Sequence, residues 1–240
     1  MKKIIHIIFL LFLLSCDNNL FNEGDIITKD IAISDFKEIH VNDIFEINLI
    51  QDTVCKIEVI AGSNLIPNLE FNVDADKKLT INDNNSARWS RDYDKIELNI
   101  SVDTLRFLRL NSSSKIVSQN TLITPEIKIM SITDYSEINI NLNCDNCYIA
   151  NSGTSGGIIN LQGETNSFTV WARASLQLNA ENFIANYVTV KTESIGDCSI
   201  HVNKELSVEV LRSGYIYYKG NPYKIEYLNE KAKEQLIKLD

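Results

Sequence analysis

The sequence contains few of the residues that keep a chain extended or unfolded. Only 3 of its 240 residues are proline and 9 are glycine, which excludes collagen-like, proline-rich and mucin-like chains. Hydrophobic residues make up 44% and charged residues 23%, so intrinsic disorder is excluded as well. The chain is therefore long enough and apolar enough to bury a sizeable core.

Basic side chains are also scarce. Lysine and arginine number 23 against 32 acidic residues, a net charge of −9. Nucleic-acid binding needs a basic footprint for the phosphates, so this balance argues against a nucleic-acid partner. The sequence has no glycine-rich phosphate loop, nucleophile elbow or zinc-protease helix motif, and we predict no cofactor, no metal and no catalytic residue.

A long hydrophobic run is missing too. The apolar stretch 4–14, interrupted by His6, has 11 residues, whereas a membrane-spanning helix needs about 20. Two lysines precede it and Leu-Leu-Ser-Cys16 ends it, which resembles a bacterial lipobox. We expect residues 1–15 to be a lipoprotein signal peptide, Cys16 to be lipidated and residues 16–30 to be a polar tether. The alternative is an ordinary signal cut elsewhere, with Cys16 incidental.

Four other cysteines remain: Cys55, Cys144, Cys147 and Cys198. Cys144 and Cys147 form a C-x-x-C in an asparagine-rich bend, but no βαβ pattern surrounds it and no second ligand pair has zinc spacing. We therefore expect either a local Cys144–Cys147 disulfide, which an exported compartment permits, or buried thiols.

The abundant residues indicate a β protein. The chain has 34 isoleucines, which favour pleated surfaces, and 27 asparagines, which favour turns. Apolar alternate pairs begin at residues 108, 127, 147, 168, 188 and 206, each followed by a small or polar bend and a second short strand. A period near 20 predicts repeats that must stack to bury their apolar faces. The leucine-rich repeat signature is absent, so we predict a parallel β-helix of about six coils.

The end of such a stack needs a cover because an open strand edge invites aggregation. Asn229 can cap a helix whose first turn holds Glu230. We predict a short capping helix from Glu230 to Lys238, within a C-terminal cap of residues 223–240.

Several segments match a known family. Residues 35–47 (DFKEIHVNDIFEI), 56–65 (KIEVIAGSNL) and 78–81 (KLTI) resemble its opening, and residues 213–222 (SGYIYYKGNP) resemble its end. The family is DUF2807, the auto-transporter adhesin head GIN domain. The resemblance implies a right-handed β-helix-like solenoid, and we predict a GIN-type domain over residues 31–222 that begins with an N-terminal β region. It also implies an exported or lipid-anchored home in bacteria of the Bacteroides and Flavobacterium type.

The candidate binding residues are aromatic. Tyr215, Tyr217 and Tyr218 cluster near the last coil, Trp89 stands between two arginines in a polar loop, and Trp171 lies on a strand. Aromatic faces suit sugar rings and protein hot spots, although the tyrosines could instead pack the last coil.

We therefore expect a non-enzymatic binding or adhesion module of the cell envelope. A lipid anchor would hold it at the outer membrane, on either its periplasmic or its surface face, and its partner would be a glycan or an envelope or host protein. Two alternatives stay open. One is a polysaccharide lyase or hydrolase that uses bend acids such as Asp134 with Glu137, or Glu193 with Asp197. The other is a structural envelope spacer or stress-related lipoprotein.

Overall fold

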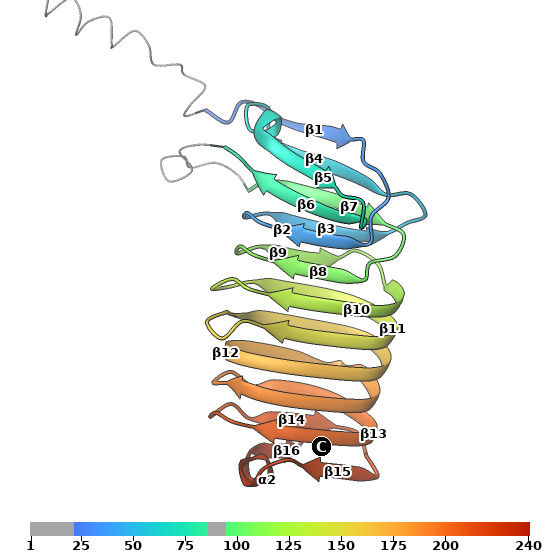
Figure 1. The fold of residues 1–240 in the computed structure, drawn as a ribbon, viewed down its shortest axis with the longest axis vertical. Coiled ribbons are helices and arrows are strands. Elements are labelled where there is room, and N and C mark those ends of the chain that lie inside the picture. Colours follow the sequence, from blue (N-terminus) through green and yellow to red (C-terminus); the bar gives the residue numbers. More distant parts are fainter. Residues whose placement is uncertain (1–21, 86–94) are drawn as a thin grey trace, which may run out of the picture.

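The computed structural model describes residues 22–85 and 95–240, which wind into a β-solenoid (Figure 1). Its elements are β1 (Ile26–Ile31), β2 (Glu38–Val41), β3 (Glu46–Gln51), β4 (Lys56–Gly62), η2 (Ile66–Asn68), β5 (Leu69–Val73), β6 (Lys78–Asp83), β7 (Glu97–Val102), β8 (Phe107–Leu110), β9 (Lys115–Ser118), β10 (Leu122–Ser131), β11 (Glu137–Asn151), β12 (Gly156–Ser194), β13 (Cys198–Val210), β14 (Ile216–Lys219), β15 (Lys224–Tyr227), α2 (Glu230–Gln235) and β16 (Leu236–Lys238).

Each coil has two strands that face each other across the core. We call the two resulting surfaces face A, which contains β1, β4, β7, β3, β9, β14 and β16, and face B, which contains β5, β6, β2, β8, the second half of β10, and β15. The strands β11, β12 and β13 run along face A, turn a corner and continue along face B, and β12 does so twice. The all-β solenoid of about six coils with an N-terminal β region is confirmed, and its right-handedness stays a prediction.

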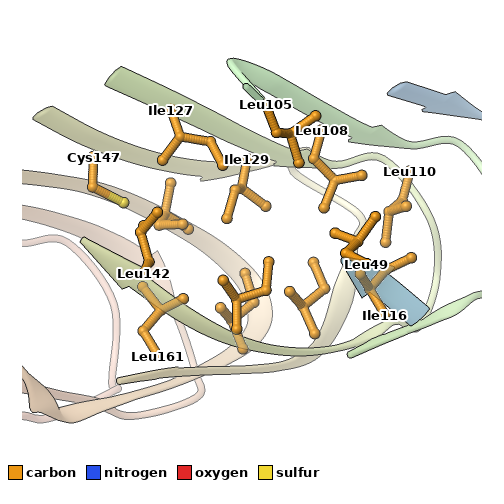
Figure 2. Packing of buried hydrophobic residues seen from close by; sticks show 14 of the residues in the cluster. Leu49, Leu105, Leu108, Leu110, Ile116, Ile127, Ile129, Leu142, Cys147 and Leu161 are labelled. Atoms are coloured by element: carbon orange, nitrogen blue, oxygen red, sulfur yellow. The ribbon is translucent and has the colours of Figure 1, made fainter. Parts of the chain in front are cut away.

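The 20-residue period places equivalent apolar residues directly above one another. On face B, Leu108 pairs with Ile129, Ile129 with Ile149 and Ile149 with Val170, and all four are at most 1% exposed. Figure 2 shows such side chains from the two faces meeting inside the coil. Strands inside the stack, such as β8 and the first half of β11, alternate buried and half-buried positions because successive side chains point to opposite sides of a sheet. The core is therefore a continuous ladder rather than a set of separate clusters.

The coils at the N-terminal end do not follow sequence order. Strand β2 pairs in parallel with both β6 and β8, and β3 pairs with both β7 and β9, so the coil of β2 and β3 lies between two later ones. Antiparallel strands end the stack there: β1 pairs with β4 on face A and β5 with β6 on face B.

The C-terminal end has a helix and one more strand. The side-chain oxygen of Asn229 accepts a hydrogen bond from Ala232 N at 3.0 Å, the expected N-cap contact. The helix predicted to reach Lys238 is wrong beyond Gln235, because residues 236–238 form β16 along β14. Leu236 sits beside Ile216 and packs against the core, so strand pairing there extends the apolar ladder by one more residue. No helix in the described ranges has the length and apolar character of a membrane span.

Amide side chains form chains of hydrogen bonds across the coils. On face A, Asn179 donates to Asn160 at 2.7 Å, Asn160 donates to Asn139, and Asn139 donates to Glu137 at 2.9 Å. All donors point toward the N-terminal end and the chain terminates in a carboxylate, an order in which each bond polarises the next. The high asparagine content therefore serves stacked strand positions as well as turns.

Candidate functional site

The structure divides the predicted tyrosine cluster. Tyr215 and Tyr217 lie at outward positions of face A with their ring centroids 6.2 Å apart. Tyr218 pairs with the buried Ile200 and packs against the core. Packing therefore accounts for Tyr218, while Tyr215 and Tyr217 remain a small outward aromatic pair. Trp89 and Cys16, the predicted lipidation residue, lie outside the described residues.

Trp171 lies at an outward position of face B, whereas Tyr215 and Tyr217 belong to face A. The Arg173 guanidinium carbon stands 3.4 Å from the Trp171 ring centroid. The indole Nε1 of Trp171 donates to Glu193 Oε1 at 3.2 Å. One side of the ring is thus covered by a cation, and the predicted aromatic residues do not converge on one site.

A shallow hollow on face B combines aromatic and charged side chains. Phe107, Lys128 and Tyr148 occupy paired positions of three successive coils. The Lys128 ammonium lies 5.4 Å from both ring centroids, a cation–π distance on each side. The hollow has a volume of about 560 Å³, and its rim also includes Glu38, Arg106 and Glu126. It can contact an apolar ring face and hydrogen-bond polar substituents at the same time.

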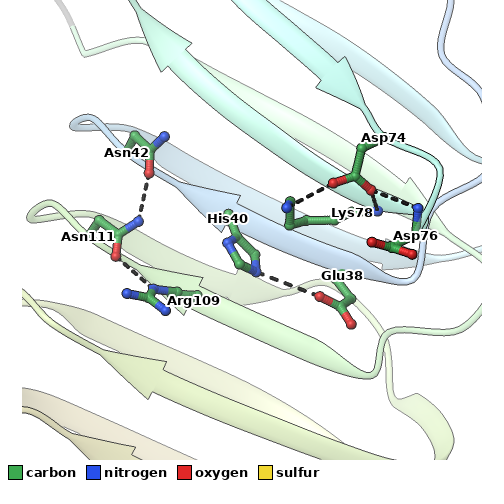
Figure 3. Close-up of polar contacts among 8 residues, drawn as sticks. All are labelled: Glu38, His40, Asn42, Asp74, Asp76, Lys78, Arg109 and Asn111. Carbon is green, nitrogen blue, oxygen red and sulfur yellow. Dashed lines mark hydrogen bonds and ion pairs between the residues drawn. The ribbon is translucent and has the colours of Figure 1, made fainter.

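A polar network borders this hollow toward the N-terminal end (Figure 3). The His40 ring meets the Phe107 ring edge to face, with centroids 5.2 Å apart, and its Nε2 lies 3.7 Å from Glu38 Oε2. Burial lowers the pKa of His40, and the nearby Arg109 lowers it further. Arg109 in turn donates to Asn111 at 2.9 Å, and Asn111 donates to Asn42 at 2.6 Å. His40 is therefore a neutral packing partner that fixes one wall of the hollow.

All four cysteines in the described residues are free thiols. The half-buried Cys144 has its sulfur 3.4 Å from Thr165 Oγ1, and its hydrogen bond with Cys147 lowers the pKa of Cys144. Burial raises the pKa of Cys147. The two thiols are in hydrogen-bond contact, so oxidation could join them without moving the chain far. The Cys144–Cys147 disulfide therefore stays a prediction. No group of three His, Cys, Asp or Glu side chains in residues 22–85 and 95–240 could hold a metal ion.

Sequence reasoning missed Phe107, Lys128 and Tyr148. A signal was present, because their spacings of 21 and 20 residues match the period of the apolar pairs. The apolar pairs that reveal the period point inward, whereas the residues between them point outward and carry the surface chemistry.

Solved structures share this fold. An adhesin-named protein from Bacteroides fragilis NCTC 9343 is 19% identical, with a TM-score of 0.73, and the match covers 90% of this chain and 94% of that one. An adhesin-named protein from Parabacteroides merdae ATCC 43184 is 19% identical, with a TM-score of 0.63 and coverage of 90% and 97%. A protein from Parabacteroides distasonis ATCC 8503, titled as lipid binding, is 17% identical, with a TM-score of 0.63 and coverage of 90% and 98%.

At these identities the likeness shows the fold alone. No curated protein matches the chain. The family model described as "Putative auto-transporter adhesin, head GIN domain" matches residues 35–222, which is most of the sequence. The chain belongs to this family, DUF2807.

Proposed function

We propose that the protein is an exported, lipid-anchored, non-enzymatic binding module of the cell envelope that binds a glycan along face B. The lipobox-like end at Cys16 and the polar segment between it and β1 support the anchor and tether. The family, whose name is that of an adhesin, supports a binding role. Two acyl chains on one cysteine would anchor the protein stably, which a single chain would not.

The hollow of Phe107, Lys128 and Tyr148 is the observation that carries the proposal. Aromatic rings provide flat apolar contact at a low cost in side-chain entropy, and the charged groups on the rim provide directional hydrogen bonds. A sugar ring has an apolar face and polar edges, so it matches both kinds of contact. The hollow is open and shallow, which suits a chain laid across several coils rather than a small molecule enclosed in a pocket.

The glycan prediction is tested on the full chain purified in detergent. A glycan array followed by calorimetric titration should show saturable binding, and Phe107→Ala and Tyr148→Ala should each weaken it about two- to twelvefold, since an aromatic contact contributes about 0.5–1.5 kcal/mol. Tyr215→Ala removes an exposed aromatic ring from face A and serves as the matched control. Equal affinities for all four proteins would refute binding at face B, and shortening of the glycan would refute the non-enzymatic assignment.

The anchor is tested separately in cells. The wild-type protein should incorporate labelled fatty acid and partition into the detergent phase, whereas Cys16→Ser should do neither. A wild-type protein that stays unlabelled and water-extractable would contradict the anchor and leave the binding assignment unaffected.

A further inference from the structure

We infer that a second hollow, on the bends that follow face B, binds the anionic group of an acidic glycan between Arg173 and Arg212. This inference rests on the proposed function for the identity of the ligand, but its site is distinct from the hollow at Phe107. The chemical class is a carboxylate or a sulfate ester carried on a sugar.

The second hollow lies across the bends of successive coils. Its volume is about 310 Å³, and Arg173, Glu193 and Arg212 supply its charged lining. Gly153 lines one side of the hollow, and the space beside it is open, because a Cβ built there would meet no atom within 4 Å. Arg173 and Arg212 thus border one open space that a small anion can enter.

Arg173 is held in place before any ligand arrives. Its guanidinium stacks on Trp171 at 3.4 Å from the ring centroid. Its backbone is clamped by Asn151, whose side-chain oxygen accepts from Arg173 N at 2.7 Å and whose amide donates to Arg173 O at 2.9 Å. Asn151 is only 3% exposed. A fixed guanidinium loses less side-chain entropy on binding than a free one, which favours affinity.

The balance of charge around the second hollow favours an anion. Neither Arg173 nor Arg212 has an ion-pair partner within the described part of the chain, whereas neighbouring Lys191 is paired with Glu209 at 2.9 Å. The carboxylate of Glu193 accepts the indole N–H of Trp171. The lining therefore carries two positive charges and one negative charge, a local positive surplus in a chain of net charge −9. Planar guanidinium groups bind carboxylate and sulfate through paired, charge-assisted hydrogen bonds.

The test titrates the full chain, purified in detergent, with three probes: a galacturonate oligosaccharide, a neutral galactose oligosaccharide of equal length and inorganic sulfate. Calorimetry measures affinity. Fluorescence of a Trp89→Phe background reports on Trp171 directly, because Arg173 stacks on its ring. Arg173→Gln and Arg212→Gln are compared with Lys231→Gln, which removes an equal charge from the exposed side of α2. Thermal melting of each variant confirms that it folds.

We expect Arg173→Gln and Arg212→Gln each to weaken binding of the acidic oligosaccharide at least tenfold, with Lys231→Gln within twofold of wild type. If sulfate binds and depends on both arginines while no glycan binds, the anion site stands and the glycan function fails. If the neutral and acidic oligosaccharides bind equally and the arginine variants change nothing, the glycan function stands and the anion site is refuted. Absence of binding by both the acidic oligosaccharide and sulfate also refutes the site.

Discussion

Gly153 lies in the turn before β12 and Gly157 is the second residue of that strand, and the structure predicts opposite outcomes when each is changed to alanine. A Cβ at Gly157 would meet Ser136 O at 2.3 Å and Ser136 N at 2.7 Å, both backbone atoms of the preceding coil. Gly157 also has φ of +119°, a conformation that residues with side chains avoid. We add about 1–3 kcal/mol for backbone strain to about 1–3 kcal/mol for forcing the coils apart. Gly157→Ala should therefore lower the free energy of unfolding by about 2–6 kcal/mol.

Gly153→Ala provides the control because its Cβ would point into open space. Its effect should stay within about 0.5 kcal/mol, as for an ordinary surface change. Thermal unfolding followed by circular dichroism should show Gly157→Ala melting at least about 4 °C lower, given about 2–4 °C per kcal/mol for a chain of this size. Equal melting temperatures for the two variants would show that the coils are not in the close contact on which the solenoid depends.

Three further predictions concern polar groups. The pKa of His40 is lowered from 6.5, so the fold favours the neutral imidazole. The contribution of His40 to the free energy of unfolding should be full above pH 6.5 and decline as the pH falls below it. Urea titrations across this pH range should show a flatter decline in His40→Gln. Iodoacetamide followed by mass spectrometry should label Cys144 first, with a midpoint below pH 9.0, and should spare Cys198, because burial raises the pKa of Cys198 to about 12. Labelling of Cys144 only after reduction would instead reveal its disulfide. Asn160→Ala interrupts the amide chain of face A and should cost about 0.5–1.5 kcal/mol by thermal unfolding, and an unchanged melting temperature would contradict a stabilising role for that chain.

The inward half of the structure could be predicted from the sequence because burial imposes a pattern. Residues such as Leu108 and Ile129 must be apolar at alternate positions and must recur once per coil, so both periods are visible without coordinates. The insertion of the β2–β3 coil between later coils could not be predicted, since those pairings join segments far apart in the chain and leave no local signal. The end of the capping helix at Gln235 was missed because three residues of strand are too short to show alternation.

The outward half was harder to predict because no burial requirement selects its residues. Phe107 and Tyr148 were overlooked as single aromatic residues, while three tyrosines close in sequence were grouped together although one of them points inward. In a solenoid, proximity on the surface follows the coil period rather than distance along the sequence. Candidate residues must therefore be compared about 20 positions apart.

The same geometry sets the size of a ligand that would use both hollows. Neighbouring strands lie about 4.8 Å apart, so the three steps from the coil of Phe107 to that of Trp171 span about 14 Å, and the five steps to the coil preceding Arg212 span about 24 Å. A single sugar cannot bridge either distance, whereas an extended acidic glycan can lie across the coils with ring faces at the first hollow and an anionic group at the second. Avidity between the two hollows then requires a chain that reaches both, because a shorter one engages a single weak site. A rod of stacked coils is suited to such a ligand, since the length of its binding surface is set by the number of coils.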